Sequence, residues 1–221
     1  MVLPFDIIYY ISLDRSIQRR KLLLKEFEKH SITDKNGNVP VWISASNGQN
    51  ISHAIDNSVK RNNRKSAISQ SEIGCFASHR KVWNLFAESG LNNCLILEDD
   101  ARFAPFLKDI LANWHLMPEW DYVNFSFITN RMSIVDTIQN CHIPELKTLC
   151  SGSGMWLTHA YSINQYAAEM FEQYTRVQTG GIDWQLTGVQ DKIKSYGFLN
   201  NGPIFQQRAT FTFPSTIKHT Q

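Results

Sequence analysis

Short apolar runs alternate with amphipathic segments along the first half of the chain, and this alternation restricts the fold more than any other feature. Three of the runs have the length and composition of buried strands: DIIYYISL (6–13), VPVWISA (39–45) and CLIL (94–97). Apolar residues at helical spacing predict a helix over 15–30. A second helix is expected to begin at a capping box of Ser69 and Glu72 and to end at Gly90. Strands that alternate with helices are typical of an α/β fold.

The second half predicts further strands at 120–127 (WDYVNFSF) and 154–158 (GMWLT). A helix is expected from Ser162, which has capping-box spacing with Gln165. No internal repeat, low-complexity tract or linker divides the 221 residues. The sequence therefore predicts a single α/β domain with a mixed sheet.

Composition argues against several classes of protein. The 22 Lys and Arg against 20 Asp and Glu give a net charge of +2, which does not favour nucleic acid as a partner. The four cysteines form no CxxC pair, so they indicate reduced, buried thiols of a cytosolic protein rather than a zinc ribbon or redox motif. No apolar run approaches the roughly 20 residues that span a bilayer, and any membrane contact is expected to be peripheral.

Three carboxylates, Glu98, Asp99 and Asp100, directly follow the predicted strand at 94–97. Adjacent like charges repel, so such a run is either solvated or neutralised by a cation. The carboxyl ends of strands are where open α/β sheets bind ligands. Two carboxylates at i and i+2 suit Mg²⁺ or Mn²⁺ holding a diphosphate, and a solvated acidic turn is the alternative.

The helix before this run makes the pattern more specific. SEIGCFASHRKVW (71–83) followed by LILEDD (95–100) resembles the signature of glycosyltransferase family 25, the lipooligosaccharide-type sugar transferases. Looser similarity continues through four other segments: IYYISLDRSIQRR (8–20), WISASNG (42–48), SGSGMWLTHAY (151–161) and GGIDWQLTG (180–188). Gln70 and Ser71 stand where Pro and Gly are usual, and Asn47 where Asp is usual.

The resemblance implies a GT-A fold, a Rossmann-like α/β domain over 1–221 with a nucleotide-sugar-binding half (1–105) and an acceptor-binding half (106–221). It also implies a UDP-sugar donor and Mn²⁺ or Mg²⁺ at a DxD-type motif, so that this cation neutralises the acids. Asp100 would ligate the metal, and Glu98 would contact the metal or the donor ribose. His219 is a proposed third metal ligand, although a frayed chain end explains it equally well.

The residues expected to bind the donor are Leu13, Arg15, Arg19, Ala45, Ser78, His79, Glu98, Asp99, Gly152 and Gly154. Arg19 could instead be a solvated helix charge, His79 a structural hydrogen bonder, and the glycines a turn. The basic group Lys60, Arg61, Arg64 and Lys65 could meet the diphosphate, an anionic glycolipid or the membrane surface, or be a solvated loop.

An inverting transferase needs a carboxylate that accepts the proton of the acceptor hydroxyl. Asp183 follows two glycines and precedes an apolar helical start, which makes it the first choice, with Asp121 and Asp191 in reserve. Its alternative role is to cap that helix.

The resulting hypothesis is a cytoplasmic, metal-dependent, inverting transferase, peripheral at the inner face of the membrane or free of it. It would move a hexose, galactose from UDP-galactose by the family resemblance, in β-linkage to a glycolipid oligosaccharide. Glucose from UDP-glucose is the closest alternative. The rival classes are a metal-dependent nucleotidyltransferase or phosphohydrolase and a non-catalytic carbohydrate-binding protein.

Overall fold

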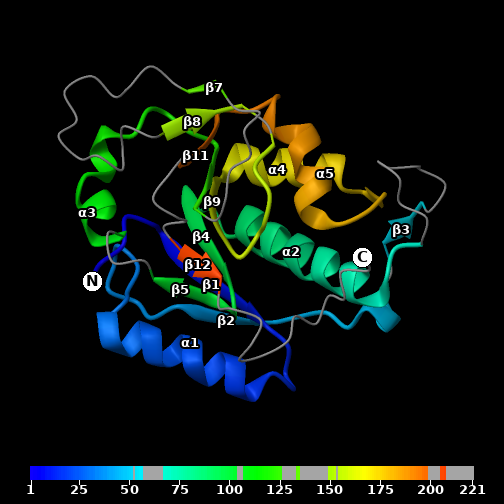
Figure 1. Cartoon of the computed structure of the whole chain (residues 1–221), viewed down its shortest axis with the longest axis horizontal. Helices are drawn as coiled ribbons and strands as arrows, with labels where there is room; N and C mark the ends of the chain where they lie inside the picture. The colour runs from blue at the N-terminus through cyan, green and yellow to red at the C-terminus, as the bar shows by residue number, and fades with distance from the viewer. Residues whose placement is uncertain are drawn as a thin grey trace.

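The computed structural model describes residues 1–51, 53–56, 67–103, 107–125, 133–134, 149–152, 154–198 and 205–207 (Figure 1). The helices are α1 (Ile17–His30), η1 (Gly48–Asn50), α2 (Gln70–Glu88), α3 (Leu107–Ala112), η2 (Trp114–Leu116), α4 (Gln165–Tyr174) and α5 (Ile182–Gln190). The strands are β1 (Ile7–Ser12), β2 (Val41–Ser44), β3 (Ala54–Ile55), β4 (Asn93–Glu98), β5 (Ala101–Phe103), β6 (Tyr122–Asn124), β7 (Ser133–Ile134), β8 (Leu149–Ser151), β9 (Ala160–Asn164), β10 (Val177–Gln178), β11 (Ser195–Phe198) and β12 (Phe205–Gln207).

Eight strands form the main sheet in the order β2-β1-β4-β9-β6-β11-β8-β7. Strand β1 pairs parallel with β2 and β4, while β9 pairs antiparallel with both β4 and β6. Strand β11 is parallel to β6 and antiparallel to β8, which is antiparallel to β7. All strands of this sheet except β9 and β8 therefore run in one direction. The predicted α/β class, a mixed and mainly parallel sheet flanked by helices, is confirmed.

Strand β9 lies between β4 and β6, so the two predicted functional halves share one sheet. The division at residue 105 stays a prediction.

The alternation of side chains along the buried strands builds two cores. In β1, Ile8 and Tyr10 face one core with α1 and α3, and Tyr9 and Ile11 face the other with α2, α4 and α5. Figure 1 shows α1 on one side of the sheet and α2, α4 and α5 on the other. Burial on both faces explains why these strands read as continuous apolar runs.

Helix α2 begins as its sequence predicts. The Ser69 hydroxyl accepts a hydrogen bond from the Glu72 amide at 3.3 Å, and the Glu72 carboxylate accepts one from the Ser69 amide at 2.9 Å. After the last turn, Gly90 adopts φ +70°, which a residue with a side chain adopts only with strain. Trp83 and Phe86 are fully buried and dock the helix on the sheet.

Two expectations in the second half are wrong. Residues 154–158 form no strand; the strand is β9, six residues further along at Ala160–Asn164. Ser162 lies inside this buried strand, and the cap of α4 is Asn164, whose side chain accepts a hydrogen bond from the Ala167 amide at 2.9 Å. Pairing with β4 on one side and β6 on the other overrides the local helical pattern at 160–164.

Within the described part of the chain, no helix combines the length and apolar character that crossing a bilayer requires.

Candidate active site

A cavity of about 310 Å³ opens at the carboxyl ends of β1 and β4, beside η1 and the first turns of α2. Its lining includes eight residues expected to bind the donor: Leu13, Arg15, Arg19, Ala45, Ser78, His79, Glu98 and Asp99. Ligand sites at this edge of an α/β sheet are usual because the loops that follow parallel strands meet there. The structure thus brings residues from four separate segments of the sequence to one cavity.

Arg19, on α1, is the counterion of the acidic run. Its Nη2 atom lies 2.6 Å from Oδ1 of Asp99 and 2.9 Å from Oδ2 of Asp100. The side chains are largely buried, with relative exposures of 15% for Arg19 and Asp100 and 9% for Asp99. Arg19 is therefore not a solvated helix charge, and it supplies part of the neutralisation expected from a metal ion.

Asp99 is held on its other side by Ser12, whose hydroxyl donates to Oδ2 at 2.7 Å. Burial raises the pKa of Asp99 to about 6, although the charge of Arg19 and the bond from Ser12 oppose the rise. The charges of Glu98 and Asp100 raise it further.

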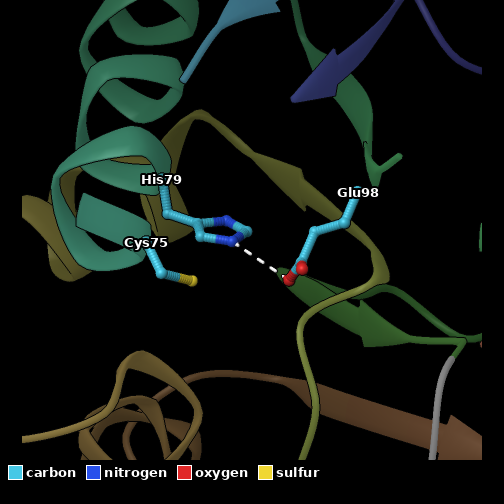
Figure 2. A group of neighbouring side chains, drawn as sticks. All are labelled: Cys75, His79 and Glu98. Atoms are coloured by element: carbon cyan, nitrogen blue, oxygen red, sulfur yellow. Dashed lines mark hydrogen bonds and ion pairs between the residues drawn. The ribbon is translucent and has the colours of Figure 1, made fainter. Parts of the chain in front are cut away.

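Glu98 points away from Arg19, toward α2. Its Oε1 atom accepts a hydrogen bond from the Thr158 hydroxyl at 2.7 Å and lies 3.3 Å from Nε2 of His79 (Figure 2). Burial disfavours its charge, but the hydrogen bonds from His79 and Thr158 outweigh burial and lower the pKa of Glu98 to about 2. Glu98 is therefore ionised at neutral pH.

His79 is fixed by the residues behind it. Its Nδ1 lies 2.8 Å from the Tyr161 hydroxyl, which accepts a hydrogen bond from Nε1 of Trp83 at 2.9 Å. Because ionised Glu98 accepts only, the network assigns a proton to Nε2 of His79, which donates to Glu98, while Nδ1 contacts the Tyr161 hydroxyl. These contacts agree with the alternative of a structural hydrogen-bonding role for His79, and the ring also lines the cavity. Its role in donor binding stays a prediction.

One wall of the cavity depends on a close approach between η1 and α2. A Cβ added to Gly48 would lie 1.9 Å from the Gln70 carbonyl oxygen, and one added to Gly74 would lie 2.8 Å from that of Ser46. Ser78 fastens the same contact, since its hydroxyl accepts from the Ser46 amide at 2.8 Å and donates to the Gly74 carbonyl at 2.6 Å. Ser78 thereby shapes the wall as well as lining it.

Asp183 lies in the first turn of α5, whose N-cap is Gly181, so Asp183 is not the cap. A Cβ added to Gly181 would lie 3.1 Å from Oδ1 of Asp183 and 3.8 Å from Oε1 of Glu72. This places Asp183 next to the first turn of α2, where Gln70 and Ser71 line the cavity.

Cys75 also lines the cavity. Burial, and then the charges of Glu98, Asp183, Asp100 and Glu72, raise the pKa of the Cys75 thiol well above its usual range.

The two reserve bases lie elsewhere. Asp121 precedes β6, which runs parallel to β4, so it lies at the opposite edge of the sheet from the acidic run. Its carboxylate accepts from the Asn164 amide group and the Lys194 backbone. Asp191 follows the last turn of α5, at the far end of that helix from Asp183.

Several predicted residues are not brought to the cavity. Gly152 and Gly154 have φ values of +111° and +94° and do not line it; the Gly154 amide donates to Gln190 of α5 at 3.0 Å. Asp100 does not line it either, and its carboxylate is held by Arg19. His219 and the basic group Lys60, Arg61, Arg64 and Lys65 lie outside the described residues. Their roles stay predictions.

Sequence reasoning did not single out Ser12, Gly74, Cys75 and Thr158 as site residues. Ser12 and Thr158 each hold a carboxylate of the acidic run, and both are near strand ends in the segments that resemble the family. Gly74 and Cys75 lie within the quoted helix motif, and that motif was the signal that could have marked them.

The residues at the end of β4 suit a divalent cation in charge and ligand type. Glu98 is an ionised oxygen ligand that lines the cavity, and Asp100 follows it by two residues. Carboxylates of this kind fit Mg²⁺ or Mn²⁺. Asp100 would have to share its charge between such an ion and Arg19.

Comparisons with known proteins agree with the sequence motifs. The model of glycosyltransferase family 25 (LPS biosynthesis protein) matches residues 5–184. Procollagen galactosyltransferase 1 of Danio rerio is 30% identical over 109 residues, which cover 46% of this chain and 17% of that protein. A glycosyltransferase 25 family member of Anopheles gambiae is 28% identical over 130 residues, covering 53% of this chain and 21% of that protein. The matched segments thus span about a fifth of these relatives.

Among solved structures, a glycosyltransferase involved in the glycosylation of the major capsid of PBCV-1 aligns with a TM-score of 0.35 and 9% identity, covering 84% of this chain and 66% of that one. The family model spans most of the 221 residues, from before β1 into the first turn of α5, and includes every described residue of the cavity. The chain therefore belongs to glycosyltransferase family 25.

Proposed function

We propose that the chain is a metal-dependent, inverting glycosyltransferase of GT-A type that uses a UDP-sugar as donor. The observation that carries the proposal is one cavity lined by both the acids Glu98 and Asp99 and the arginines Arg15 and Arg19. A nucleoside diphosphate needs cations for its phosphates, and its departure needs charge stabilisation at the same place. Membership in the family supports the reaction class.

The proposed donor site uses the loop after β1. Arg15 is exposed on the cavity and would pair with the diphosphate, while Leu13 and Ala45 would border the nucleoside. Ser78 fixes the cavity wall through its hydrogen bond with the Ser46 amide, and His79 fixes the Glu98 carboxylate. Mn²⁺ or Mg²⁺ held by Glu98 and Asp100 would supply the positive charge that stabilises the leaving group.

Asp183 is the proposed general base. It lies in the first turn of α5, beside the first turn of α2. From there its carboxylate would take the proton of the acceptor hydroxyl as that oxygen attacks the anomeric carbon. Attack from the face opposite the leaving group inverts the configuration and gives a β-linkage from an α-linked donor.

The proposed sugar and acceptor rest on the names of the relatives and of the family. Galactose is the first choice because one relative is named a procollagen galactosyltransferase, and glucose is the second. The description of the family as an LPS biosynthesis protein favours a glycolipid oligosaccharide as acceptor, with the enzyme in the cytoplasm or at the inner membrane surface.

Product analysis separates this proposal from its rivals. Incubation of the protein with UDP-galactose or UDP-glucose and Mn²⁺ should release UDP, with transfer of the hexose to an added glycoside or to water. Release of UMP and a hexose 1-phosphate would instead indicate cleavage of the phosphoanhydride, as a nucleotidyltransferase or phosphohydrolase performs it. Binding of sugars with no turnover of any nucleotide sugar would support a carbohydrate-binding protein.

A further inference from the structure

Three side chains of different chemistry that line the cavity lie close together. Cys75 and His79 lie one turn apart on α2, and Glu98 ends β4. The ligand atoms of the three residues, Sγ, an imidazole nitrogen and a carboxylate oxygen, all lie within 4.8 Å of one another. Figure 2 shows the thiol and the imidazole ring of α2 directed toward the Glu98 carboxylate.

This ligand set differs from that of a hard cation. Thiolate, imidazole and carboxylate together are typical of Zn²⁺ and Co²⁺, whereas Mg²⁺ and Mn²⁺ take oxygen ligands. Around a tetrahedral Zn²⁺ with bonds of about 2.0–2.3 Å, ligand atoms lie roughly 3.3–3.8 Å apart. The ligand atoms of the cluster are at most 4.8 Å apart, which exceeds the shortest tetrahedral spacing by about 1.5 Å. Rotations of the side chains can close this difference.

Hydrogen bonds from neighbouring side chains fix the orientation of two of the three proposed ligands. Tyr161 contacts Nδ1 of His79 and thereby orients Nε2 toward the cluster. When Nε2 gives up its proton to bind a metal, the ring proton resides on Nδ1 and is donated to the Tyr161 oxygen, as the second ring nitrogen does at histidines that bind metals. Thr158 fixes the Glu98 carboxylate in the same way. Burial, and then the charges of nearby carboxylates, raise the pKa of the Cys75 thiol. A thiolate there therefore needs a bound cation, and the same carboxylate charges attract one.

We propose that Cys75, His79 and Glu98 bind a borderline-soft dication of the Zn²⁺ class, with the fourth coordination position open to the cavity that all three line. This site differs from the hard-cation site proposed at Glu98 and Asp100, but it shares Glu98 with it. Zn²⁺ bound there removes Glu98 from the donor site. Zn²⁺ is then an inhibitor of donor binding, a consequence that rests on the proposed function.

Cobalt is the direct probe of the cluster, because a Co²⁺–thiolate bond absorbs in the near ultraviolet and tetrahedral Co²⁺ absorbs strongly in the visible. The whole chain is titrated with Co²⁺ and then with Zn²⁺, as wild type, Cys75→Ser and Cys94→Ser. Cys94 is the matched control, since it is a free, buried cysteine in β4 outside the cluster. Wild type and Cys94→Ser should develop both bands and lose them to Zn²⁺, while Cys75→Ser should lack the thiolate band and bind Zn²⁺ at least about tenfold more weakly.

Equal spectra and equal Zn²⁺ affinities in wild type and Cys75→Ser would overturn the site. Thermal unfolding without metal shows whether Cys75→Ser is folded, so a missing band is not mistaken for a missing fold.

A second titration tests the shared carboxylate. UDP-galactose is titrated in Mn²⁺ with and without one equivalent of Zn²⁺, and we expect at least tenfold weaker donor binding with Zn²⁺ in wild type and much less effect in Cys75→Ser. Donor binding that Zn²⁺ leaves unchanged would overturn the competition. If UDP-galactose fails to bind even without Zn²⁺, the proposed donor site is wrong, and the cobalt spectra still decide the cation site.

Discussion

The guanidinium of Arg19 lies 2.6 Å from the carboxylate of Asp99, and this ion pair joins α1 to the turn that follows β4. The same guanidinium also contacts Asp100 at 2.9 Å. Two of three adjacent carboxylates therefore share an internal counterion, while Glu98 is held separately by His79 and Thr158. The acidic run thus has two parts, one paired with Arg19 and one facing α2.

Replacing Arg19 should destabilise the fold. Arg19→Gln leaves Asp99 and Asp100 largely buried without their cation, and we expect the free energy of unfolding to fall by about 2–4 kcal/mol. Urea denaturation of Arg19→Gln, Asp99→Asn and the double variant measures the coupling, which should be about 1–3 kcal/mol. The exposed Arg15 is the control, and Arg15→Gln should change stability by less than about 0.5 kcal/mol. A coupling near zero would mean that the pair contributes nothing to the fold.

The capping box of α2 should have a measurable effect on stability. Ser69→Ala removes the side chain that accepts the Glu72 amide proton, and we expect a loss of about 1 kcal/mol. Ser71→Ala, two residues further on at an exposed position, is the matched control and should change little. Equal effects of the two substitutions in chemical denaturation would contradict the importance of the cap.

Asp183→Asn should separate catalysis from donor binding. If Asp183 takes the acceptor proton, its amide variant should lower kcat by about 10²–10⁴-fold and leave the affinity for the UDP-sugar within about threefold of wild type. Asp191→Asn, at the other end of α5, should behave as wild type. Full activity of Asp183→Asn would show that another group is the base.

Stability should depend on Asp6 at acid pH. Its side chain, 2% exposed, is paired with Lys35 and accepts from the Asn92 amide at 2.7 Å. Burial alone would raise the pKa of Asp6, but Lys35 and Asn92 outweigh it and hold the pKa below 3.8. Because the folded-state pKa is lowered, the contribution is complete above about pH 4 and is lost as the pH falls through the folded-state pKa.

Asp6→Asn should therefore lower the free energy of unfolding by about 1–3 kcal/mol at pH 7, and its difference from wild type should shrink toward pH 2. Urea denaturation at several pH values measures this. A difference that stays constant down to pH 2 would mean that the charge of Asp6 is not what stabilises this corner.

The main strands and helices of the first half were predictable because the residues that specify them lie within the elements themselves. The apolar runs of β1 and β4 and the Ser69–Glu72 cap lie within a few residues of the structure that they specify. The second half was less so: Ser162 has the spacing of a helix cap, but it lies in β9 between two strands that are distant in sequence. Its conformation depends on pairing that no local pattern shows.

The site, too, has residues that local sequence indicated and residues that only the tertiary structure shows. The acidic run and the helix motif singled out Glu98, Asp99 and His79, and the structure brings all three to one cavity. The partner of Asp99 is Arg19, 80 residues earlier on a helix of otherwise ordinary charges, and only the docking of α1 reveals it. The sequence predicted only a reduced, buried thiol at Cys75. Its closeness to Glu98 depends on how α2 packs against the sheet, which no local pattern shows.

The most direct test of the central claim is calorimetric titration of UDP, UDP-galactose and UDP-glucose into wild type and Asp100→Ala, with Mn²⁺ and with chelator. We predict binding that requires both Mn²⁺ and Asp100 and that prefers one of the two sugars. Asp100→Asn, which keeps the shape of the side chain, should lose binding as well and thus separates the loss of charge from a loss of fold. Absence of binding of every UDP species to folded wild-type protein in Mn²⁺, or equal binding by Asp100→Ala in chelator, would contradict the metal-dependent donor site.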